Sequence, residues 1–400
     1  MSNYKSLAMY YIFYGLKGLS IYLLMFCIMN LSPKINFFDF GISYSLFLIL
    51  VPLLNFGVSS LILRYSYSYK NQQMGFMFSS MIQFIAIVVA LLTLLIDIEI
   101  GLVILWAIFR SLYLSYESFL ISGRHYLILS SLYLFYIIGL LLVSLGVYNE
   151  TLINLSNVLI SLIFLELIVL PFFLKHLSKE SLNGIYYSSK VRSRILTYVV
   201  PISVLSVLMA SFLNFDKLII SSLTSLKNQD EYVFLFFVIL AIHRFLTTPF
   251  IMRYSPQYYE ADDNKISSRI VLGGMVSIII CTSLFATFFK FVQPQNFLPT
   301  YIFAFSYLVL ALFLLNLQML YFKKRLLLNI LIRNFFMGFV LSFFVMILTL
   351  TIFGTQFIDV ALVTNSIVMV YFLAQSNKVV ENYFIHFLAF LAIVFLLIRL

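Results

Sequence analysis

Charged side chains recur along one apolar segment in the first half of the sequence. Arg110, Glu117 and Arg124 lie seven residues apart, a spacing that places side chains on one face of a helix. The residues around them are almost all apolar or aromatic, so the helix is expected to lie in a membrane. A charged side chain at the centre of a membrane helix costs about 2.5–3.5 kcal/mol, so these residues require partners or a function.

Other ionisable side chains fall inside further apolar segments. Lys17 lies midway along the first segment and Arg244 midway along the eighth, which favours a position beside a wet cavity between helices. Arg124 is interpreted as an ordinary cytoplasmic anchor. The titratable candidates for ion coupling or gating are Glu117, Glu166, Asp216, Lys217 and His243.

Structural roles remain open for several of these residues. Glu166 could serve only as a hydrogen-bond partner of a neighbouring helix. Asp216 and Lys217 could form a pair at the level of the lipid headgroups, and His243 could be a packed histidine. Arg110 and Glu117 are two turns apart, whereas side chains that pair on one helix are three or four residues apart. Partners on other helices, or a ligand, are therefore expected for both.

Cations outnumber carboxylates among the deepest of these groups. Lys17, Arg110 and Arg244 stand against Glu117 and Glu166, so a cavity lined by them would attract an anion. Arginine suits a phosphate or diphosphate because its guanidinium can bind two oxygens at once. Tyr113 lies close to these charges and offers sugars both a flat apolar face and a hydroxyl. The predicted substrate-binding residues are Lys17, Arg110, Arg244 and Tyr113.

The composition determines the fold class. Of the 400 residues, 63% are hydrophobic and only 10% are charged, whereas about a quarter of a soluble domain is charged. The chain is therefore predicted to be an all-α polytopic membrane protein. Apolar segments of about 20 residues can span a bilayer as helices. They cover residues 7–31, 41–63, 74–96, 100–122, 126–148, 152–174, 196–221, 231–252, 269–290, 297–322, 330–353 and 357–375, with a thirteenth candidate at 382–398.

The loops between these segments indicate the orientation and the domain plan. Lys and Arg concentrate in alternate loops, which places the N-terminus in the cytoplasm. The longest polar stretch, residues 175–195, divides the chain into a six-helix bundle at 1–174 and a second at 196–376. Residues 377–400 hold the extra C-terminal candidate helix. The net charge of +10 is explained by cytoplasmic loops, so no nucleic-acid partner is expected.

The two cysteines give no sign of a disulfide or of a metal site. Cys27 and Cys281 both lie in apolar stretches. No metal and no cofactor are expected.

Two stretches carry a family resemblance. The first is FFDFGISYSLFLILVPLLNFGVSSLILRY at 37–65; the second runs from LNFDKLIISSL to EYVFLFFVILAIHRFLTTPFIMRYSPQYYE within 213–260. Together with the division into six and six segments, they resemble the polysaccharide transporter branch of the MOP superfamily, the O-antigen or Wzx-like flippases. The resemblance implies transport of an undecaprenyl-diphosphate-linked oligosaccharide repeat unit across the bacterial inner membrane. It also implies membrane lipids, a polymerase and a chain-length regulator as partners.

Two other classes of protein share this size and hydrophobicity. An O-antigen polymerase or a lipid-linked-sugar glycosyltransferase generally carries catalytic residues on a sizeable outer loop, whereas the first outer loop here is only LSPKINFFDFG (31–41). An enzyme is therefore disfavoured. A small-molecule secondary transporter also fits the two-bundle plan, but the loop RYSYSYKNQQMG (64–75) lacks the acidic, glycine-rich pattern of a facilitator.

Overall fold

The computed structural model describes mainly the first half of the chain. The described residues are 2–32, 35–60, 69–122, 125–152, 154–168, 197, 199–211, 214 and 328–353, with single positions between 233 and 321. The chain divides into two compact units, Met1–Thr224 and Ser225–Leu400. The predicted loop 175–195 and the C-terminal candidate 377–400 lie outside the described residues.

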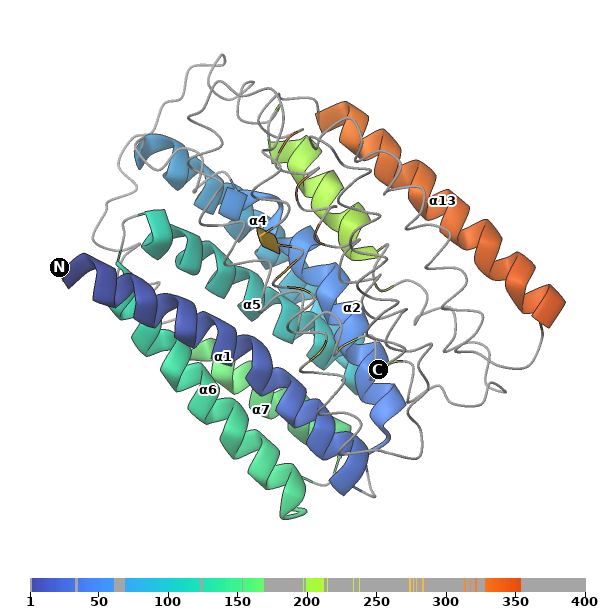
Figure 1. The fold of residues 1–400 in the computed structure, drawn as a ribbon. Helices are drawn as coiled ribbons and strands as arrows, with labels where there is room; N and C mark the ends of the chain where they lie inside the picture. The colour runs from blue at the N-terminus through green and yellow to red at the C-terminus, as the bar shows by residue number, and fades with distance from the viewer. Residues whose placement is uncertain are drawn as a thin grey trace. The chain divides into compact units, whose positions relative to one another are not determined.

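Every regular element in the described residues is a helix (Figure 1). The first unit contains α1 (Ser2–Leu31), α2 (Phe37–Asn55), α4 (Tyr69–Leu94), α5 (Ile98–Ser122), α6 (Tyr126–Tyr148) and α7 (Leu155–Leu167). A shorter apolar helix, Val199–Ser211, belongs to the same unit. The helix of the second unit that is described in full is α13 (Leu328–Phe353).

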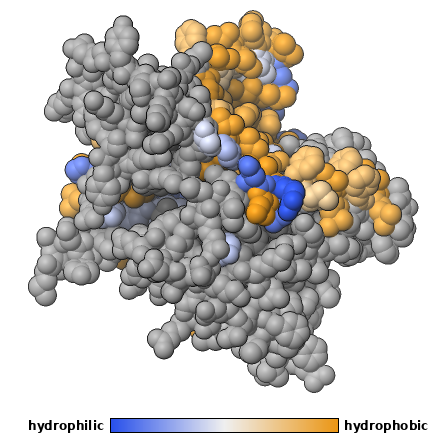
Figure 2. Space-filling view, turned by 90° about the horizontal axis from the view of Figure 1, so that it is seen from above, coloured by the Kyte–Doolittle hydropathy of each residue, from blue (hydrophilic) through white to orange (hydrophobic). Residues whose placement is uncertain are grey.

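These helices coincide closely with the apolar segments predicted from the sequence. The predicted segment 126–148 has the bounds of α6, and 100–122 differs from α5 only at its start. Of the described helices, four are long and apolar enough to cross a membrane. Large apolar side chains such as Phe84, Phe135 and Phe164 are more than 60% exposed. The described surface in Figure 2 is accordingly mostly orange, as expected for a surface that faces lipid.

Polar residues define where two of the helices begin. Asn36 precedes α2, and its Oδ1 accepts a hydrogen bond of 3.0 Å from the Phe38 amide. Asp97 plays the same part before α5, where its Oδ1 accepts from the Ile100 amide at 3.0 Å. Such caps satisfy backbone donors that have no partner inside the helix.

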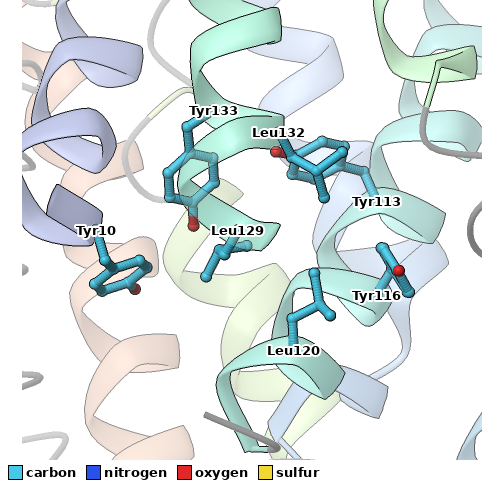
Figure 3. Packing of buried hydrophobic residues seen from close by; sticks show 7 residues of the cluster. All are labelled: Tyr10, Tyr113, Tyr116, Leu120, Leu129, Leu132 and Tyr133. Carbon is cyan, nitrogen blue, oxygen red and sulfur yellow. The ribbon is translucent and has the colours of Figure 1, made fainter. Parts of the chain in front are cut away.

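The core of the first unit is built around α5. This helix contacts α2, α4, α6 and α7, while α1 lies along α6 in the most extensive helix pair (Figure 1). A tyrosine-rich cluster fills the space between α1, α5 and α6 (Figure 3). Within it, the rings of Tyr10 and Tyr133 lie 5.8 Å apart. The cluster consists of Tyr10, Tyr113, Tyr116, Leu120, Leu129, Leu132 and Tyr133.

Helix α2 ends earlier than the sequence predicts. The apolar segment 41–63 was expected to be continuous, but the helix stops at Asn55 and helical residues resume only at 58. Phe56 and Gly57 between them have φ values of 46° and 70°, in the left-handed region. Hydropathy does not register such a break, because the residues on both sides are apolar. Pro52 and Gly57 were the signals in the sequence.

Replacement of Gly57 by alanine should destabilise the protein. A residue with a Cβ pays about 1–2 kcal/mol in a left-handed conformation, and the new Cβ would lie 3.1 Å from the Val199 carbonyl oxygen. Thermal unfolding of the purified variant in detergent should therefore show a lower midpoint. Gly18→Ala is the matched control because a Cβ there meets nothing within 4 Å. Equal midpoints for the two variants would show that the break tolerates an ordinary residue.

Candidate functional site

Helix α5 carries the charged residues of the site on one of its faces. Arg110, Tyr113 and Glu117 are spaced by three and four residues, so they lie one above another along the helix. At 3.6 residues per turn, Ser111 lies about 100° and Ser115 about 140° further round the helix than Arg110. The charged face meets residues of α1, α6 and α7, whereas the serines meet residues of α2 and α4.

The first ion pair joins α1 to α5. Lys17 Nζ lies 3.5 Å from Glu117 Oε2, and the Tyr133 hydroxyl donates a hydrogen bond to Glu117 Oε1. Lys17 is 7% exposed and Glu117 6%, so the pair is withdrawn from the surface. The ammonium also lies 4.3 Å from the Tyr133 ring centroid and 4.4 Å from that of Tyr113. Both rings are close enough for cation–π attraction.

The second ion pair joins α5 to α7. Arg110 Nη1 lies 3.4 Å from each carboxylate oxygen of Glu166. The Tyr136 hydroxyl donates to Glu166 Oε1 at 3.0 Å. A charge-assisted hydrogen bond is usually about 2.7–2.9 Å long, so this contact between arginine and carboxylate is loose.

The contact with Glu166 uses only one nitrogen of the Arg110 guanidinium. Only Nη1 donates to Glu166, and Nε and Nη2 donate to no described residue. The Arg110 side chain is 17% exposed, whereas that of Glu166 is fully buried. Arg110 therefore has donors without a described partner on a side chain that is not fully buried.

Tyr113 lies between the two cations. Its ring centroid is 4.4 Å from Lys17 Nζ and 4.7 Å from Arg110 Cζ. The ring is 2% exposed, and its hydroxyl makes no hydrogen bond with any described residue. Tyr113 thus connects the two ion pairs and has a polar atom available for a ligand.

The structure confirms one sequence prediction about these charges. Arg110 and Glu117 do not pair with each other, and each finds its partner on another helix, as the spacing predicts. In the described part of the site two cations face two carboxylates, and Arg244, the third cation of the predicted excess, lies outside the described residues. The pairing is expected, since an isolated charge in a low-dielectric interior costs several kcal/mol.

The structure does not describe several of the residues predicted for the site. Asp216, Lys217, His243 and Arg244 are outside the described residues. Among the described residues, no group of three His, Cys, Asp or Glu side chains comes together in a way that could hold a metal.

Sequence reasoning missed the two tyrosines that complete the ion pairs. Tyr133 and Tyr136 are three residues apart on α6, so they share a face that can reach both Glu117 and Glu166. Their spacing was visible, but the sequence holds 27 tyrosines, and most membrane tyrosines pack or lie at the interface.

Comparisons with solved structures identify the fold. The chain is similar to a MATE protein in complex with MaL6, with a TM-score of 0.60 and 15% identity over 100% of this chain and 98% of the other. It is also similar to a mutant form of the Vibrio cholerae MATE transporter VcmN, with a TM-score of 0.56 and 14% identity over 96% and 98% of the two chains. The fold is that of the MATE transporters.

A third solved structure relates this fold to a wider group. It is an inward-facing multidrug resistance MATE family transporter of the MOP superfamily, with a TM-score of 0.57 and 14% identity over 94% of this chain and 95% of the other. No family model matches the sequence, and no curated protein matches it. The likeness to these solved structures shows the fold of the chain.

Proposed function

We propose that the protein is a flippase that moves an undecaprenyl-diphosphate-linked oligosaccharide repeat unit across the bacterial inner membrane for O-antigen or capsular polysaccharide assembly. The support is threefold: a fold shared with MOP-superfamily transporters, charged residues inside the first unit, and the sequence resemblance of residues 37–65 and 213–260. Sugars and diphosphate cannot cross hydrocarbon unaided, because loss of their hydration without new partners is very costly. A polar path between helices supplies those partners while the lipid tail stays in the bilayer.

The observation that carries the proposal is the unused edge of Arg110. Its Nε and Nη2, which donate to no residue in the described part of the chain, form the planar pair of donors that binds two phosphate oxygens at once. The side chain is partly exposed, and its contact with Glu166 is loose. We infer that a substrate diphosphate binds these donors and competes with Glu166 for Arg110.

The carboxylates then have a role beyond charge balance. Glu166 neutralises Arg110 while no substrate is bound, and it is released when a phosphate takes its place. Glu117, Glu166, Asp216, Lys217 and His243 are the proposed coupling or gating groups. Alternating access follows from rocking of one bundle against the other.

Tyr113 and Arg244 complete the proposed substrate contacts. The Tyr113 hydroxyl is available for a phosphate or sugar oxygen. Arg244, which lies outside the described residues, is kept as a separate substrate-binding candidate. Lys17 is held by Glu117 in this structure, so its part in the proposal is to hold Tyr113 and Tyr133 in place from α1.

The setting proposed for this activity is a bacterial one. The N-terminus lies in the cytoplasm, and the chain works beside a polymerase and a chain-length regulator. It is not an enzyme, because transport requires no covalent step. A small-molecule exporter is the second candidate, favoured by the likeness to the multidrug resistance MATE transporter.

Deletion of the gene separates these functions. For a flippase, surface polysaccharide should disappear and the lipid-linked repeat unit should accumulate facing the cytoplasm, where an added membrane-impermeant glycosidase cannot reach it in intact spheroplasts. A polymerase deletion would instead leave single repeat units at the surface. Normal polysaccharide together with new sensitivity to small toxic cations would favour the exporter.

A further inference from the structure

The break in α2 is anchored by a single side chain. The Asn55 Nδ2 donates to the Ser111 carbonyl oxygen at 3.2 Å and to Ser115 Oγ at 3.0 Å, both on α5. Its Oδ1 accepts from the Ser59 amide at 3.1 Å, on the far side of the break. One amide group therefore joins the end of α2, the chain that follows the break, and the middle of α5.

This contact belongs to a larger polar network buried among apolar helices. Gln83 of α4 donates to Ser111 Oγ at 2.9 Å, and the Ser115 hydroxyl donates to the Ser111 carbonyl oxygen at 3.1 Å. Asn55 and Gln83 are 6% and 4% exposed, and both serines are fully buried. Polar side chains of this kind hold membrane helices together because lipid offers them no alternative partner.

The network and the charged site share the same helix. Ser111 directly follows Arg110, and Ser115 lies between Tyr113 and Glu117. A rotation or shift of α5 that breaks the Asn55 contacts would therefore also move the charged face relative to Glu166 of α7.

The backbone beside Asn55 can act as a pivot. Phe56 and Gly57 both adopt left-handed conformations, so the helix is interrupted between Asn55 and residue 58. Gly57 also packs closely on the helix Val199–Ser211, where an added Cβ would lie 3.1 Å from the Val199 oxygen. The pivot is thus enclosed by two other helices of the same unit.

We propose that the 55–57 break is a hinge in α2, and that Asn55 and Ser115 form a latch that positions the charged face of α5. When the latch is closed, Arg110 and Tyr113 are held for substrate. When it opens, α5 and the segment after Gly57 move relative to each other. The hinge stands on the geometry alone, whereas its role in transport rests on the proposed function.

An isosteric pair at Ser115 tests the latch. Threonine and valine add the same bulk to this buried position, but only threonine keeps the oxygen that accepts from Asn55. Ser115→Thr should retain export of surface polysaccharide. In Ser115→Val, export should fall about tenfold or more, as expected for the loss of two buried hydrogen bonds. Ser131→Val and Ser131→Thr are the controls, since the Ser131 hydroxyl makes a similar bond to the Leu127 carbonyl oxygen on an exposed face.

A spectroscopic signal reports on the hinge without any substrate. Trp106 is the only tryptophan in the sequence, it is 1% exposed, and it lies on α5. Its ring stacks on Phe47 of α2, with centroids 3.7 Å apart. The fluorescence of Trp106, excited selectively in the purified protein, therefore reports on the packing of α2 against α5.

The expected result is a second fluorescence lifetime of Trp106 in Ser115→Val and Asn55→Ala. Ser115→Thr and the exposed control Asn30→Ala should keep the wild-type decay. Equal behaviour of Ser115→Thr and Ser115→Val, in decay or in export, would overturn the latch. The fluorescence decay is measured without substrate, so it tests the hinge separately from the proposed function. If the flippase test fails but the decays of Ser115→Thr and Ser115→Val still differ, the proposed substrate is wrong and the hinge stands.

Discussion

Replacement of Arg110 by alanine is expected to abolish surface polysaccharide. The substitution removes the free guanidinium edge that the proposed function assigns to the substrate diphosphate. It also leaves Glu166 buried without its cation, and breaking a buried pair in this way costs about 3–5 kcal/mol. A single variant therefore cannot distinguish lost binding from lost folding.

A double variant separates the two effects. Arg110→Met with Glu166→Gln removes both charges and keeps an oxygen that can accept from Tyr136. The amount of protein in the membrane should return toward the wild-type level, while export should remain absent. Normal export by this variant would mean that the pair only supports the fold. Arg333→Met is the matched control, because Arg333 is exposed on α13.

A lysine at position 110 tests the geometry of the contact. Arg110→Lys keeps the positive charge, and with it a partner for Glu166, but loses the planar pair of donors. Export should be restored only in part, as measured by the amount and length of surface polysaccharide. Full restoration of export would show that only the positive charge at position 110 is required. Arg244→Ala is expected to match Arg110→Ala in export.

The sequence predicts the charged face of α5 well because that face depends only on local spacing. Arg110 and Glu117 are two turns apart on any helix, and their apolar surroundings require partners elsewhere. Which residues those are depends on how the helices pack. Lys17 is 100 residues from Glu117, and Glu166 is 56 residues from Arg110, so no local pattern connects them.

The parts that the sequence did not predict share a physical cause. Asn55, Ser111 and Ser115 are small polar residues in apolar segments, where each alone counts as a tolerated helix residue. They form a network only because the packing of α2 against α5 brings them within hydrogen-bond distance.

Loss of the Glu117 carboxylate should destabilise the fold more than loss of any exposed charge on the same helix. Glu117→Ala leaves Lys17 buried with two tyrosine rings but no anion, at a cost of about 3–5 kcal/mol. The midpoint of thermal unfolding in detergent should fall accordingly. Glu99→Ala is the matched control, because Glu99 is exposed near the start of α5.

Removal of both charges should recover the stability. Lys17→Met with Glu117→Gln keeps the bulk of both side chains and an acceptor for Tyr133. Replacing a buried ion pair by residues of similar volume is often neutral for stability. Because Glu117 is one of the proposed coupling or gating groups, the stable double variant should still export less polysaccharide than the wild type. Export at the wild-type level would remove Glu117 and Lys17 from the transport mechanism and leave the pair a structural role.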